Sequence, residues 1–170
     1  ITPLKNLTNL HTLNISRNKS LCDLSILKHL TNLQKLNISE CKSLSDISVL
    51  KHLTNLQKLN ISECASLSDI SILKHLETLE TLNMGAGMFR TSSLNDISAL
   101  NGLTKLKHLD LSGCTELADR EKWSPLYSLP SLRTLEGPFP KSLKTKLFAK
   151  NAANQKDWSY ILSEKDEWMT

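Results

Sequence analysis

The stretch LKHLTNLQKLNISEC occupies residues 27–41, and the same fifteen residues return at 50–64. The second copy starts 23 residues after the first. A single catalytic site needs each of its residues once, whereas a repeated surface needs the same residues many times at a fixed spacing. The repetition therefore favours a repeated structural unit over a single catalytic site.

Apolar residues give both copies the same frame, from Leu33 to Leu53 and from Leu56 to Leu76. Within the unit, LQKLNIS alternates as a short strand does, and SDISVLKHL has an apolar residue at every third position, which is typical of a 3-10 segment. No unit buries its own apolar side, so successive units must stack.

Related units start at Leu10, Leu79, Leu106 and Leu132, which makes six, the last of them partial. We expect one aspartate to cap each helical segment, namely Asp23, Asp46, Asp69, Asp96 and Asp119.

One strand and one short helix per ~20–29 residues resembles the leucine-rich-repeat family. The SDISVLKHL half is similar to the protein-phosphatase-regulator type, and LNISEC is similar to the cysteine-containing type of F-box proteins. The tandem units are also similar to leucine-rich-repeat proteins of trypanosomes. The resemblance covers residues 1–137. It implies an α/β solenoid with a curved parallel sheet on the concave face, short 3-10 or α segments on the convex face, and a C-terminal cap.

The end of the repeat region and the residues after it form a separate part of the pattern. Residues 120–137, REKWSPLYSLPSLRTLEG, resemble the capping motif of such domains, with Glu136 replacing the usual aspartate. Residues 138–170 carry no repeat, and SLKTKLFAKN and DWSYILSEKDEW each fit a helix. We expect this extension to pack on the cap through Trp158 and its neighbours, with a partner-binding tail as the alternative.

Composition excludes several classes of protein. The formal charge of +4 is mild and the acidic residues are mixed among the basic ones, which argues against a nucleic-acid protein. Apolar runs are too short for a membrane span. Four cysteines are too sparse for a secreted disulfide scaffold, so we expect free thiols and a cytoplasmic or nuclear protein. The chain starts within the repeat pattern, and we expect it to be a fragment of a longer protein.

No part of the sequence carries a strong motif for catalysis or metal binding. Cys41 and Cys64 occupy equivalent places, but the repeat offers no further ligands, so we expect buried thiols and no metal or cofactor. His29, His52 and His75 form a column beside lysines, which favours a solvated convex ladder, with a proton sensor as the alternative. No nucleophile motif or phosphate-binding glycine loop is present, so neither an enzyme nor a small-molecule substrate is expected.

The candidate binding surface consists of polar side chains that point outward from successive strands, together with a loop at 84–94 that is four residues longer than its counterpart. Its candidate residues are Thr12, Asn14, Arg17, Lys35, Asn37, Glu40, Lys58, Asn60, Glu63, Thr81, Asn83, Met88, Phe89, Arg90, His108 and Asp110. One alternative makes the identical middle units spacers that set length and curvature. Another folds Phe89 back onto the next unit.

The sequence therefore predicts a non-enzymatic protein–protein interaction module, such as an adaptor, scaffold or regulatory subunit, with a protein as its partner. The alternative is the target-recognition domain of a larger enzyme or effector whose catalytic domain lies outside this chain. Nucleic-acid binding through Lys35, Lys58 and the lysines after residue 140 is disfavoured, because acidic residues are scattered among them.

Overall fold

The computed structural model describes residues 4, 6–86 and 94–152 of the chain. Six short strands form one sheet in which neighbours in the sequence are neighbours in space, and every pair is parallel. The strands are β1 (Thr12–Asn14), β2 (Lys35–Asn37), β3 (Lys58–Asn60), β4 (Thr81–Asn83), β5 (His108–Asp110) and β6 (Thr134–Glu136).

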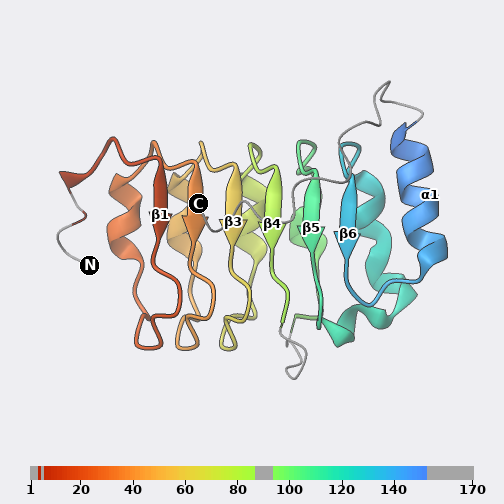
Figure 1. Cartoon of the computed structure of the whole chain (residues 1–170), viewed down its shortest axis with the longest axis horizontal. Helices are drawn as coiled ribbons and strands as arrows, with labels where there is room; N and C mark the ends of the chain where they lie inside the picture. The colour runs from red at the N-terminus through yellow and green to blue at the C-terminus, as the bar shows by residue number, and fades with distance from the viewer. Residues whose placement is uncertain (1–3, 5, 87–93, 153–170) are drawn as a thin grey trace.

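The other layer consists of short 3-10 segments that follow the strands. They are η2 (Ser25–His29), η3 (Ser48–His52), η4 (Ser71–His75), η5 (Ser98–Leu100), η6 (Thr115–Ala118) and η7 (Arg120–Ser128). The one α-helix among the described residues is α1 (Lys141–Ala152). Figure 1 shows the strands side by side in chain order, with the 3-10 segments behind them and α1 next to β6. The predicted leucine-rich-repeat solenoid is confirmed.

Leucine layers hold the stack together. The central residue of each strand after β1 points into the core, as Leu36, Leu59 and Leu82 show with at most 1% of their surface exposed. Leu27, Leu50 and Leu73 close the same layers from the 3-10 segments and are 0% exposed. Each such side chain contributes about 2 kcal/mol through burial. This burial comes largely from contacts between neighbouring coils, which explains the repetition of the sequence.

The capping prediction needs a correction of one residue. Asp46 lies just before the N-cap position, which Ile47 occupies, and its Oδ1 accepts a hydrogen bond from the N–H of Ser48 at 2.7 Å. The side chain thus forms a local turn that reaches two residues ahead, which suits the tight start of a 3-10 segment. Asp23, Asp69 and Asp96 do the same for Ser25, Ser71 and Ser98. Asp119 precedes η7, where its backbone carbonyl accepts from the N–H of Lys122.

Aromatic rings and α1 cover the end of the sheet beyond β6. Trp123 is buried, donates from Nε1 to the carbonyl of Leu117 at 2.8 Å, and meets the ring of Phe139 edge-on at 5.9 Å. From α1, Leu143 and Leu147 are buried, and Asn151 donates to the carbonyl oxygens of Leu129 and Leu132. The first of the two helices expected after residue 138 is therefore present and packs on the last coil.

The second expected helix, with Trp158, lies outside the described residues. The boundary between a repeat domain at 1–137 and an extension at 138–170 stays a prediction. No helix within the described ranges is long and apolar enough to cross a membrane.

Candidate partner-binding surface

One row of side chains crosses all six strands on the face opposite the 3-10 segments, and we call it the outer column. Register places each member directly beside the next, because the first residues of neighbouring strands are Cα partners throughout. The members are Thr12, Lys35, Lys58, Thr81, His108 and Thr134. Thr12 and Lys35 are exposed, and the remaining four are half-buried. The expected row of outward residues is thus assembled from six separate parts of the chain.

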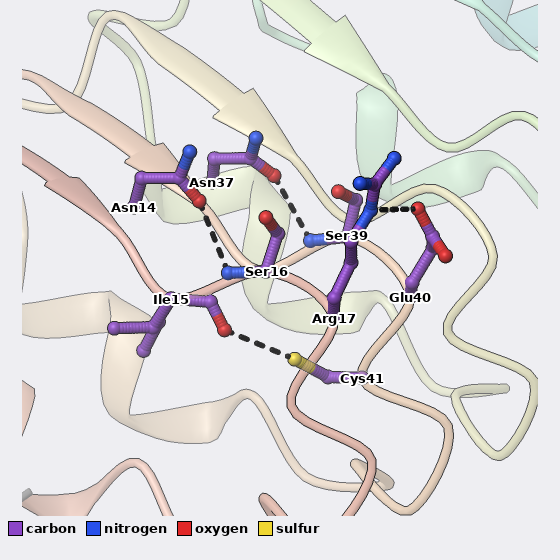
Figure 2. A network of polar contacts seen from close by, with 8 residues as sticks. All are labelled: Asn14, Ile15, Ser16, Arg17, Asn37, Ser39, Glu40 and Cys41. Atoms are coloured by element: carbon purple, nitrogen blue, oxygen red, sulfur yellow. Dashed lines mark hydrogen bonds and ion pairs between the residues drawn. The ribbon is translucent and has the colours of Figure 1, made fainter.

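A second row, the asparagine column, has a structural role that the sequence analysis missed. The Oδ1 atoms of Asn14 and Asn37 accept hydrogen bonds from the N–H groups of Ser16 and Ser39, at 3.1 and 3.0 Å, as Figure 2 shows. Asn60, Asn83 and Asp110 repeat this contact two residues ahead, at 2.8–3.0 Å. These side chains therefore fix the turn that leaves each strand from β1 to β5. The signal in the sequence was an Asx residue two positions before the bend, a known local turn former.

The predicted rim residues take an unusual backbone conformation. Arg17, Glu40 and Glu63 have φ angles of 61°, 59° and 55°, in the left-handed region, and Gly113 occupies the same place in a later coil with φ 73°. Arg17 Nε and Glu40 Oε1 form an ion pair of 2.9 Å (Figure 2). The Arg17 side chain is 81% exposed, so this pair contributes less than about 1 kcal/mol.

Cys41 and Cys64 lie under the rim and are buried in the core. Sγ of Cys41 donates to the carbonyl of Ile15 at 3.5 Å (Figure 2), and Sγ of Cys64 donates to that of Ile38 at 3.2 Å. Burial raises the pKa of the Cys64 thiol to about 11. Burial also raises the pKa of the Cys41 thiol. Both thiols are therefore protonated at neutral pH and are poor ligands or nucleophiles. In the part of the chain that the structure describes, no group of three or more His, Cys, Asp or Glu residues is placed to hold a metal ion.

The half of the sheet from β4 to β6 has polar contacts between side chains of neighbouring coils. His108 Nδ1 lies 3.0 Å from Thr134 Oγ1, which links two members of the outer column. Nearby, Lys107 Nζ and Glu80 Oε2 form an ion pair of 2.8 Å. These contacts join side chains of neighbouring coils at this end of the sheet.

The remaining predicted residues lie either on the convex side of the solenoid or outside the described part of the chain. His52 and His75 are exposed and His29 is half-buried, and they occupy the same place in η2, η3 and η4. The predicted anchor residues Met88, Phe89 and Arg90 lie outside the described residues. The described part of the candidate surface therefore consists of strand residues together with the rim residues Arg17, Glu40 and Glu63.

Comparison with known proteins agrees with this geometry. Residues 28–117 match the family model for plant disease resistance protein RPS2-like leucine-rich repeats. This match spans more than half of the chain, and the chain belongs to the leucine-rich-repeat family. No curated protein matches the sequence significantly. The phosphatase-regulator, F-box and trypanosome resemblances stay predictions.

Two solved structures, both internalins from Listeria monocytogenes, are similar to this chain. Internalin C2 is 26% identical with a TM-score of 0.51, and the match covers 81% of this chain and 65% of that one. Another internalin is 26% identical with a TM-score of 0.48, and the match covers 78% of this chain and 49% of that one. The chain thus spans less than two thirds of either protein. The shared fold is that of a protein–protein interaction module.

Proposed function

We propose that this chain is a non-enzymatic adaptor, scaffold or regulatory module that binds a protein partner through its concave face. The outer column is the observation that carries the proposal. Six side chains from six strands stand in register on a sheet whose turns are fixed by the asparagine column. A surface organised in advance loses little conformational entropy on binding, which favours recognition by many modest polar contacts.

The experiment compares the same change of charge on the two faces of the solenoid. A Lys35→Glu/Lys58→Glu variant alters the outer column, and a Lys28→Glu/Lys51→Glu variant alters two exposed convex lysines with the same separation along the chain. Partners captured from lysate of the source cells are quantified by mass spectrometry, after both variants are shown to melt like the parent.

We expect one or more partners to be lost with the concave variant and retained with the convex variant. Equal retention by both variants would remove the concave strands from the binding surface. A Phe89→Ala variant, tested in parallel, assigns the 84–94 loop as a second contact if it weakens capture of the same partner.

A further inference from the structure

The side-chain amides of the asparagine column turn one kind of group toward a partner. The Oδ1 atoms of Asn14, Asn37, Asn60 and Asn83 each accept a hydrogen bond from the backbone N–H two residues ahead. A backbone N–H only donates, so the oxygen must face the turn and Nδ2 must point away from it, as Figure 2 shows for Asn14 and Asn37. None of the four Nδ2 atoms has a hydrogen-bond acceptor among the described residues. The free groups of the column on β1–β4 are therefore mainly N–H donors.

The same column carries acceptors after β4. Asn83 is the Cα partner of Asp110, and Asp110 is the Cα partner of Glu136. Asp110 uses Oδ1 as the asparagines do, accepting from the N–H of Ser112 at 2.8 Å, so its Oδ2 replaces the Nδ2 of an asparagine. Glu136 Oε2 lies 3.6 Å from Lys144 Nζ. Carboxylate oxygens only accept hydrogen bonds. One continuous row thus offers donors on β1–β4 and acceptors on β5 and β6.

Partial burial makes this order of groups selective. Asn37 and Asn83 are half-buried, and Asn60 is 8% exposed. Among the described residues no buried side-chain nitrogen or oxygen lacks a partner, so the free amides of these residues reach water. A partner that covers the column removes this water and must supply an acceptor for each donor. A main chain brings one donor with every acceptor, so a run of acceptors has to come from side-chain oxygens.

The charges beside the column are of both signs. Lys35, Lys58 and His108 precede the column in their strands. Glu40 and Glu63 follow it at the rim. These flanking groups therefore do not select the charge of a partner, whereas the order of donors and acceptors along the column selects its hydrogen-bonding groups.

We propose, building on the binding function proposed above, that the asparagine column recognises a protein segment by the order of its polar side chains. Side-chain oxygens of aspartate, glutamate, asparagine or glutamine lie over the amides of β1–β4. A lysine or arginine of the same segment lies over Asp110 on β5. A segment with the reverse order sets donors against donors and acceptors against carboxylates, and it is rejected.

Peptides selected on the full chain from a random display library are the probes. Those weakened by Lys35→Glu bind the concave face, and we expect them to carry acceptor side chains toward one end and a lysine or arginine toward the other. Isothermal titration calorimetry gives their affinities for the parent and for three isosteric variants, after thermal melts show that each variant is folded.

The variants exchange a donor for an acceptor without removing the turn. Asn37→Asp keeps an oxygen for the N–H of Ser39, as Asp110 does for Ser112, and replaces the donors of Nδ2 by an acceptor. We expect it to weaken these peptides about tenfold, and we expect the converse change, Asp110→Asn, to weaken them similarly. Asn95→Asp makes the same change at an exposed asparagine before η5 and should leave the affinities unchanged.

The results separate this recognition from the proposed function. Peptides that lose affinity with Lys35→Glu but keep it with both Asn37→Asp and Asp110→Asn overturn recognition by the asparagine column and leave the proposed function standing. Selection of donor-rich peptides over β1–β4 overturns it in the same way. A library from which no peptide is weakened by any of these changes on the concave face contradicts the proposed function as well.

Discussion

The amide of Asn37 shows two roles at the scale of one residue. It belongs to the concave face of β2, yet its Oδ1 accepts from the N–H of Ser39, a residue with only 8% of its surface exposed. A buried N–H without an acceptor costs about 1–3 kcal/mol. The asparagine column is therefore first a means of holding the turns, and only its remaining polar atoms are available to a partner.

This role predicts losses of stability of different size for two substitutions at Asn37. Asn37→Leu keeps the size and removes the acceptor, and we expect it to lower the free energy of unfolding by about 1–2 kcal/mol. Asn37→Asp keeps an oxygen in the same place, as Asp110 does in β5, and we expect a much smaller loss. Urea unfolding followed by circular dichroism measures both. Similar losses for the two variants would show that the hydrogen bond is unimportant.

Alanine substitutions at Gly113 and Gly102 distinguish the cost of a left-handed backbone from the cost of a steric clash. Both have a positive φ, 73° and 88°. A Cβ at Gly113 would lie 2.6 Å from the carbonyl oxygen of Ala86, whereas a Cβ at Gly102 would meet nothing within 4 Å. We expect Gly102→Ala to cost about 1 kcal/mol, from the left-handed backbone alone.

Gly113→Ala should cost at least about 1 kcal/mol more than Gly102→Ala, because the neighbouring coil must also move. Chemical unfolding of the two single variants gives the difference. A Gly113→Ala protein as stable as the Gly102→Ala protein would mean that the coils around Ala86 separate easily.

At the scale of the element, the aspartates before the 3-10 segments make stability depend on pH. Hydrogen bonds from Ser25, Ser48 and Ser71 hold the pKa values of Asp23, Asp46 and Asp69 below the usual 3.8. A carboxyl group whose pKa is lower in the folded state stabilises the fold above its unfolded pKa. That contribution disappears as the pH falls from near 3.8 through the lower, folded value.

We therefore predict that an Asp46→Asn/Asp69→Asn variant loses less stability on acidification than the parent does. The amides still offer an acceptor oxygen to Ser48 and Ser71 but do not titrate. Thermal melts between about pH 5 and pH 2 measure the effect. Glu77→Gln, which removes an exposed carboxylate outside these turns, should follow the parent. A double variant that still follows the parent would contradict the prediction.

At the scale of the whole molecule, α1 closes one end of a stack that would otherwise expose a leucine layer. Leu147 on α1 is 2% exposed. We expect Leu147→Ala to lower stability by about 2–4 kcal/mol, because it opens a cavity between the helix and the last coil. The neighbouring Lys146→Ala, at an exposed position, should change stability by less than about 0.5 kcal/mol. Equal melting temperatures for the two variants would show that α1 does not support the stack.

The period of the sequence predicts the stack, its register and its leucine layers, because Leu36, Leu59 and Leu82 recur once in every repeat. It does not decide the local role of Asn37, since an asparagine two positions before a bend fits both a turn acceptor and an outward binding residue. The sequence also gives no sign of the left-handed backbone at Arg17, Glu40 and Glu63. Glycine, the residue typical of that conformation, occupies the equivalent position only at Gly113. The candidate anchors Met88, Phe89 and Arg90 stay predictions.

The register of identical coils also bears on how such a chain can change during evolution. Loss of residues 41–63 would join Glu40 to Cys64 and restore the junction ISEC, with β2 then beside β4. Every leucine layer would keep its neighbours, while the concave face would become shorter by one strand, about 4.8 Å. Unequal recombination between the two copies of the repeated stretch would thus change the length of the concave face in steps of one whole strand.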